Sequence, residues 1–161
     1  MSWIVLVRWL HILTAAAWLG QVVVLNFVLV PAVVKEERAE ARLDLLQKLF
    51  PPIFRLASIL SGLSVVAGGF LLWGRHHEDW STLFASWHGH ALVTGATLAV
   101  LLMAFHHALE PKLGRMIRKA HEAKDAAASD AIVRKLKIAP RIGLGVLTLV
   151  MVLMMIGVRG V

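Results

Sequence analysis

Apolar residues dominate four segments of the chain, at residues 9–31, 53–73, 88–108 and 142–158. Each segment is close to the roughly 20 residues with which an α-helix crosses the hydrocarbon core of a bilayer. Lipid offers the backbone no hydrogen-bond partner, so each spanning segment must satisfy its own N–H and C=O groups as a helix. The pattern therefore predicts an all-α fold, in which residues 1–161 form one integral membrane domain, a four-helix bundle.

The connections between these segments are polar and predict further local structure. Residues 35–52, KEERAEARLDLLQKLFPP, alternate acidic and basic residues at helical spacing, which predicts a short surface helix ended by Pro51 and Pro52. The connection at 109–141 is the most basic part of the chain, and we expect a loop there. Its centre, KDAAASD, predicts a turn, with Ser129 or Asp130 as the cap of the segment that follows.

The distribution of basic residues also predicts how the bundle is oriented. Cytoplasmic loops of membrane proteins carry an excess of Lys and Arg. The connections at 35–52 and 109–141 are therefore expected inside, and both termini with the middle loop outside. We expect a multi-pass protein of a bacterial-type inner membrane, with the lipid bilayer as its main partner.

Composition narrows the chemistry. The chain is 58% apolar, carries a net charge of +7 and has no cysteine. In a membrane protein this charge indicates anionic lipid rather than nucleic acid, and without cysteine there are no disulfides, thiolate metal sites or iron–sulfur clusters. Phosphate-binding glycine loops, nucleophile elbows and paired intramembrane carboxylates are absent too, which favours an electron-transfer or transport protein over a stand-alone enzyme.

Ionisable residues inside a spanning helix are candidates for function. His11 and His90 are expected at similar depth near the outer face, on the first and third spans, where they could ligate the iron of a haem b. Thr94 continues the His90 face, and Trp18 could pack against the ring edge. The basic residues that could pair with the propionates are Arg8, Arg75 and Arg159. The plainer alternative is that both histidines only form hydrogen bonds between helices.

A copper site is the second hypothesis for the same outer layer. Met151, Met154 and Met155 lie on the fourth span, and thioether and imidazole ligands suit cuprous copper. His88 would be their imidazole partner, and it also competes with His90 as a haem ligand. Methionine is, however, a routine filler of apolar helices.

Other polar residues in the spans have no assigned role. His106 and His107, followed by Glu110, lie toward the inner face, where they could titrate or contact a quinone head group, or simply be solvated. Gln21 and Asn26 could bond to neighbouring helices or belong to a path through the membrane.

Residues 10–34, LHILTAAAWLGQVVVLNFVLVPAVV, resemble the first helix of the copper-resistance D-type (CopD) membrane proteins, with His11 and Trp18-Leu19-Gly20 in matching places. The four-span layout is also similar to that of the HemJ-type protoporphyrinogen oxidases, with Pro140 opening the last span. The first resemblance implies copper uptake, and the second implies haem b ligated by His11. The chain departs from the HemJ pattern at Asn26 and Pro31, and again at His88-Gly89-His90.

These observations lead to one main hypothesis and several alternatives. The main one is a haem b-binding protein for electron transfer, either between quinol and an outer partner or as a subunit of a larger respiratory complex. Quinone and other membrane subunits are candidate partners, and a homo-oligomer is a candidate assembly. A copper transport or resistance protein is the first alternative. A HemJ-like oxidase and a cofactor-free assembly subunit are the others.

Overall fold

The computed structural model describes residues 3–159 as helices joined by short turns, with no strand in that range. The helical elements are α1 (Trp3–Val24), the π-helical turn η1 (Leu25–Leu29), α2 (Val30–Lys35), α3 (Ala39–His76), α4 (Ser81–Phe84), α5 (Trp87–Glu122) and α6 (Ala126–Arg159). The side chain of Arg159, a predicted propionate partner, lies outside the described part.

Four stretches are long and apolar enough to cross a membrane: Trp3–Lys35, which joins α1, η1 and α2, then Ala39–His76, Trp87–Glu122 and Ala126–Val158. The prediction of an all-α integral membrane bundle is therefore confirmed, and the protein is a multi-pass membrane protein surrounded by lipid.

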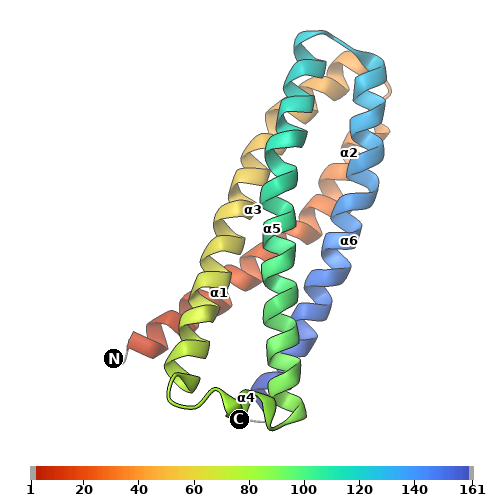
Figure 1. Cartoon of the computed structure of the whole chain (residues 1–161). Coiled ribbons are helices and arrows are strands. Elements are labelled where there is room, and N and C mark those ends of the chain that lie inside the picture. The colour runs from red at the N-terminus through yellow and green to blue at the C-terminus, as the bar shows by residue number, and fades with distance from the viewer. Residues whose placement is uncertain (1–2, 160–161) are drawn as a thin grey trace.

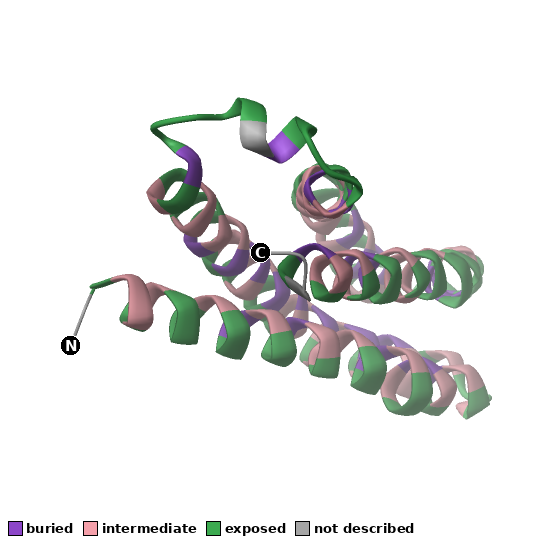
Figure 2. Cartoon of the chain, turned by 90° about the horizontal axis from the view of Figure 1, so that it is seen from below, coloured by how far each residue is buried: buried purple, intermediate pink, exposed green. Residues whose placement is uncertain are grey.

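The helices run up and down and pack mainly on their neighbours in sequence. α1 packs along α3, α3 along α5, and α5 along α6, while α6 closes the bundle by contacting α1, η1 and α2. Figure 1 shows why the first span contacts both α3 and α6. It is inclined, and it passes from α3 at its start to α6 at its end. Viewed along the bundle from the end that carries α4, the buried residues lie on the helix faces turned toward one another (Figure 2).

Prolines do not end the helices, contrary to the sequence prediction. α3 continues through Pro51 and Pro52 to His76, so the expected surface helix and the second span are one element. Proline removes one backbone hydrogen bond and crowds the preceding turn. Packing offsets that cost here, because Phe50 and Phe54 on either side of the prolines are 0% and 5% exposed.

The predicted loop at 109–141 is a helical hairpin. α5 continues to Glu122 and α6 begins at Ala126, so both helices extend beyond the predicted spans 88–108 and 142–158. The turn residue Lys124 has a positive φ of 49°. Asp125 caps α6, because its carboxylate accepts a hydrogen bond from the Ala128 N–H at 3.0 Å. The prediction of Ser129 or Asp130 as the cap was wrong, because the side chains of both accept hydrogen bonds from Arg42.

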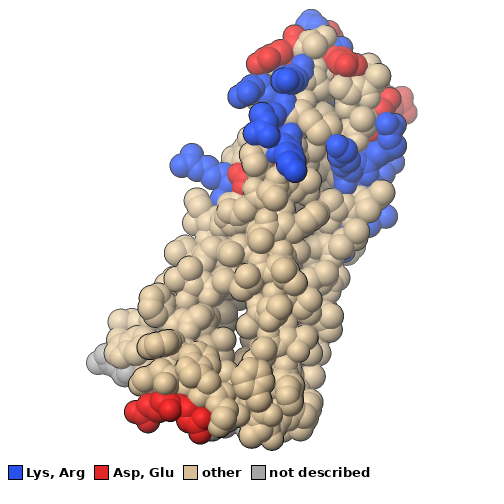
Figure 3. Space-filling view, in the orientation of Figure 1, with Lys and Arg blue, Asp and Glu red and all other residues tan. Residues whose placement is uncertain are grey.

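The tightly packed apolar core lies at the end of the bundle away from α4. It joins residues of α3, α5 and α6 with η1 and α2, among them Leu43, Leu46, Phe50, Ile117, Ile132 and Leu136. Lys and Arg gather over the same end in Figure 3, which we call the basic end; the opposite end is the α4 end. Water surrounds the basic end and drives apolar burial there, whereas along the spans lipid covers exposed apolar side chains at no such cost.

Candidate functional site

His11 lies on α1 in the half of the bundle next to α4, where its ring is held against α3. Its Nδ1 is 2.8 Å from the backbone carbonyl oxygen of Ser64. A carbonyl oxygen only accepts, so Nδ1 carries the proton and the neutral ring keeps its lone pair on Nε2. Gly68 faces the ring, and a Cβ there would come within 2.9 Å of His11 Cε1. A carbonyl and a glycine of α3 therefore orient His11.

The predicted α5 partners of His11 lie elsewhere. His90 is exposed, with the edge of its ring against Phe84 at a centroid distance of 6.3 Å. His88 is half-buried, and its ring centroid is 4.2 Å from that of Trp87. α1 packs along α3 and makes no comparable packing with α5. The structure therefore does not bring His11 and His90 into direct contact.

The residues expected around a haem are also spread out. Arg8 and Thr94 are both exposed, and Arg8 forms no ion pair among the described residues. Trp18, in contrast, is only 3% exposed and lines a cavity in the middle of the bundle. Trp18 thus lines this cavity, and its role beside a haem ring stays a prediction.

The three methionines of the predicted copper site have different surroundings. Met154 packs against α5, where its Cε is 3.4 Å from the position of a Cβ built on Gly95. Met155 is 60% exposed, and Met151 is half-buried. Within residues 3–159 no group of three or more His, Asp or Glu side chains could hold a metal ion. Met154 thus packs between α5 and α6, and Met155 is exposed on the surface of the bundle.

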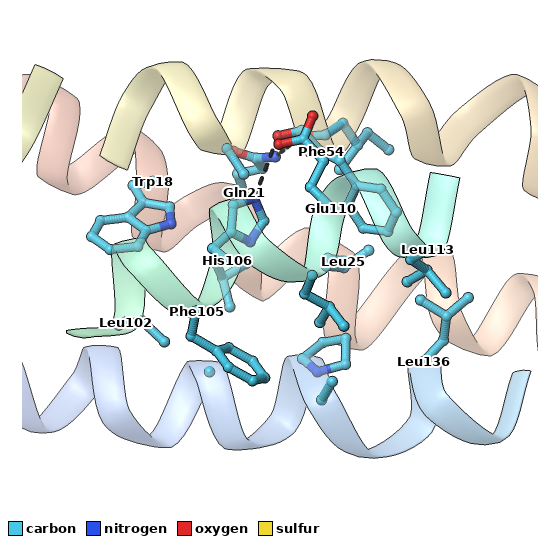
Figure 4. A pocket seen from close by; sticks show the side chains of 17 residues that line it. Trp18, Gln21, Leu25, Phe54, Leu102, Phe105, His106, Glu110, Leu113 and Leu136 are labelled. Carbon is cyan, nitrogen blue, oxygen red and sulfur yellow. Dashed lines mark hydrogen bonds between the residues drawn. The ribbon is translucent and has the colours of Figure 1, made fainter. Parts of the chain in front are cut away.

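The four spans line a partly open cavity of about 70 Å³ between the middle of the bundle and the basic end (Figure 4). Most of its lining is apolar, with Trp18 and Leu25 from the first span, Phe54 from α3, Phe105 from α5 and Leu136 from α6. Three polar side chains also line it: Gln21, His106 and Glu110. Figure 4 shows these three on the side of the cavity next to α3.

Gln21 connects the first span to α3 across this cavity. Its amide nitrogen donates a hydrogen bond to the backbone carbonyl of Ile53. Its Oε1 is buried and has no hydrogen-bond partner among the described residues. A buried acceptor without a partner costs about 1–3 kcal/mol. The cavity beside it provides room for a water molecule to donate that bond.

His106 and Glu110 lie one helical turn apart on α5 and share the face that lines the cavity. His106 Nε2 is 3.4 Å from the carbonyl oxygen of Phe54, so this nitrogen carries a proton and Nδ1 of the neutral ring is an acceptor. The carboxylate of Glu110 accepts a hydrogen bond from the hydroxyl of Ser58. α3 thus holds both ionisable groups in place through one carbonyl and one hydroxyl.

His107 differs from its neighbour. It is exposed, and its Nδ1 bonds to the carbonyl of Met103 in its own helix at 2.9 Å. Asn26 has a structural role: its amide bonds to the carbonyls of Val22, at 2.8 Å, and of Pro140, at 3.0 Å. It therefore ties η1 to α6 beside the cavity. π-helical turns of this kind are frequent at functional sites.

Sequence reasoning placed the site at the α4 end and left the central cavity undetected. It recognised Gln21, His106 and Glu110 as polar residues that needed a reason, but assigned them no common site. The available signal was the four-residue spacing of His106 and Glu110, which puts an imidazole and a carboxyl on one helix face. The convergence of three spans on that face depends on the inclination of α1, which the sequence does not show.

Comparison with known proteins adds a family. Residues 13–122 match the sequence model of one protein family, a domain of unknown function (DUF4149). No curated protein and no solved structure matches the chain. The matched region contains Gln21, His106 and Glu110, whereas His11 and the methionines of α6 lie outside it. Because the match covers more than half of the 161 residues, the chain belongs to the DUF4149 family.

Proposed function

We propose that the protein transfers protons at the central cavity, as the proton-binding part of a proton-coupled membrane transporter. The observation that carries this proposal is the pair His106 and Glu110, held in a cavity lined by all four spans. Ionisable groups inside a membrane bundle are costly and typically mark ion pathways or proton relays. Most of the surrounding lining is apolar, so the pair has no evident role in simple packing.

The contacts around the pair suit an exchange of protons. Ser58 donates a hydrogen bond to the Glu110 carboxylate, and Nδ1 of the neutral His106 ring can accept a proton. Both groups hydrogen-bond to α3, so a change in the charge of either one alters the contact between α3 and α5. A proton bound here is thereby coupled to the packing of two spans, as a transport cycle requires.

The size of the cavity limits what enters it. A volume of about 70 Å³ suits a small number of water molecules. Pockets for drug-sized ligands have roughly 300–1,000 Å³. The cavity in this conformation therefore fits water and protons rather than a porphyrin or a quinone ring.

The experiment that tests the proposal is a proton-flux assay. The full-length protein is reconstituted into liposomes with a pH-sensitive dye inside, and a pH gradient is imposed. We expect flux above that of protein-free liposomes for the wild type. Glu110→Gln, which keeps the shape and removes the ionisable group, should reduce the flux to the protein-free level, and His106→Gln should reduce it strongly.

The neighbouring histidine provides the matched control. His107→Gln makes the same chemical change one residue away, on the exposed face of α5, and should leave the flux unchanged. Equal flux in the wild type and Glu110→Gln would refute the proposal, as would a wild type that conducts no protons.

Electron transfer with haem b is the second candidate, and one observation favours it. Histidines that ligate metals usually donate their other ring N–H to a carbonyl or carboxylate, which orients the ring and leaves the second nitrogen free. The bond from His11 Nδ1 to Ser64 has this form. The residues present fit one oriented ligand, supplied by Nε2 of His11. A second ligand is not brought to it, since His90 stands on α5 and is exposed.

An optical spectrum tests the second candidate. Protein purified in detergent with sufficient haem supply should show a reduced-minus-oxidised spectrum of haem b, and His11→Ala should abolish it. His90→Ala then decides whether α5 supplies the other axial ligand. A colourless, folded wild-type protein would rule out this candidate. Copper binding by the α6 methionines stays a prediction, as do the resemblances to the CopD and HemJ families.

We further propose that the protein resides in an inner membrane of bacterial type, with the basic end toward the cytoplasm. The support is the concentration of Lys and Arg at one end of the bundle (Figure 3), because such residues are retained on the cytoplasmic side. The cavity would then lie nearer the cytoplasmic face than the outer one.

A further inference from the structure

We propose that a set of basic side chains around the basic end binds the phosphate head groups of anionic phospholipids. The set, which we call the basic collar, consists of Arg55 on α3, Lys112 and Arg115 on α5, and Lys137 and Arg141 on α6. All five side chains are exposed. The inference is independent of the proton-transfer proposal.

The position of the collar along the helices places it at the head-group layer. Arg55 is next to Leu56, which is 48% exposed, and Arg141 is next to Ile142, which is 60% exposed. Large apolar side chains that are exposed in a spanning helix face lipid tails, so the charged neighbours stand where the hydrocarbon ends. Lys112 follows the predicted end of the third span by four residues, or about 6 Å along the helix.

Four basic residues of the basic end outside the collar, Arg38, Arg42, Arg118 and Lys124, have acidic partners. At the tip of the basic end, Lys124 pairs with Glu40 at 3.1 Å and Arg42 pairs with Asp130 at 2.5 Å. Arg38 and Arg118 pair with acids close in sequence. No collar residue has an ion pair within residues 3–159. These four charges are therefore neutralised by nearby acids, and the five charges of the collar are not.

The sequence around the collar contains almost no acid to compensate it. α6 has no Asp or Glu after Asp130, and α3 has none after Asp44. On α5 the only acid between Trp87 and Lys119 is Glu110, which bonds to Ser58. Figure 3 shows the result: acidic and basic side chains are mixed at the tip, and Lys and Arg predominate below it. An unpaired positive belt at this level matches the phosphates of an anionic leaflet.

The full-length protein in neutral detergent provides the test, with thermal unfolding as the measurement. We expect added phosphatidylglycerol to raise the Tm, and phosphatidylcholine or inorganic phosphate to leave it unchanged. The triple variant Lys112→Gln/Arg115→Gln/Arg141→Gln should lose this rise. A control with the same loss of charge at the tip, Arg38→Gln/Arg118→Gln/Lys124→Gln, should keep it.

Three results would overturn the inference. One is an equal rise for the collar variant and the wild type. Another is a rise in Tm with inorganic phosphate equal to that with phosphatidylglycerol, which would assign the site to a free anion. The third is a wild-type Tm that phosphatidylglycerol does not raise. If the collar variant does not fold, the wild-type protein alone tests the proposal. Its difference in Tm between phosphatidylglycerol and phosphatidylcholine should shrink in roughly 0.5 M salt, which screens the attraction to the head groups. A difference that persists in salt would also refute the proposal.

Discussion

At the scale of residues, two adjacent residues of the same type have different roles because they lie on different faces of their helix. His106 faces the central cavity and bonds to α3, while His107 bonds to its own helix and is exposed. Gly68 meets the ring of His11, whereas a Cβ on Gly69 would have nothing within 4 Å. Such pairs supply matched controls, because the same chemical change one residue apart tests a single contact.

The glycine pair leads to a prediction about stability. Gly69→Ala adds a methyl group in open space and should raise the stability by up to about 1 kcal/mol, since alanine favours helices over glycine. Gly68→Ala adds the same group against the His11 ring, breaks its bond to Ser64 and should instead lower the stability by about 1–3 kcal/mol. Thermal unfolding of both variants in one detergent measures this, and shifts of equal sign and size would contradict it.

At the scale of elements, the sequence predicted four spanning helices but not how far each helix continues beyond its apolar span. Pro51 and Pro52 looked like a terminus because proline weakens a helix locally, yet α3 continues through them. The basic stretch at 109–141 looked like a loop because of its charge. Its apolar residues Leu113 and Ile117, and Ile132 and Leu136, nevertheless recur at a spacing of four, which is the signal of two amphipathic helices.

At the scale of the whole molecule, charge and packing are distributed unequally between the two ends. The basic end carries the apolar core, the Lys and Arg ion pairs and the basic collar, whereas the α4 end carries Glu78 and Asp79 in a short turn. The α4 end also holds the beginning of α1 and the end of α6 (Figure 1). An even number of spans returns the chain to the side from which it started.

Labelling with cysteine tests this arrangement directly, since the chain has no cysteine of its own. Ser81→Cys at the α4 end and Ala127→Cys at the basic end are both exposed positions. A membrane-impermeant thiol reagent added to intact cells should label Ser81→Cys and leave Ala127→Cys unlabelled until the membrane is opened. Labelling of both from the same side would refute the proposed topology.

The sequence by itself determined the fold class, the four apolar spans and the set of polar residues that need a partner, because these depend on local composition and helix length. Only the tertiary structure decided which helix each polar residue faces: His11 turns to α3, and Gln21, His106 and Glu110 meet in one cavity. The physical reason lies in the lipid. Faces that contact lipid and faces that contact other helices are both apolar, so periodicity does not reveal which side of a spanning helix packs inward.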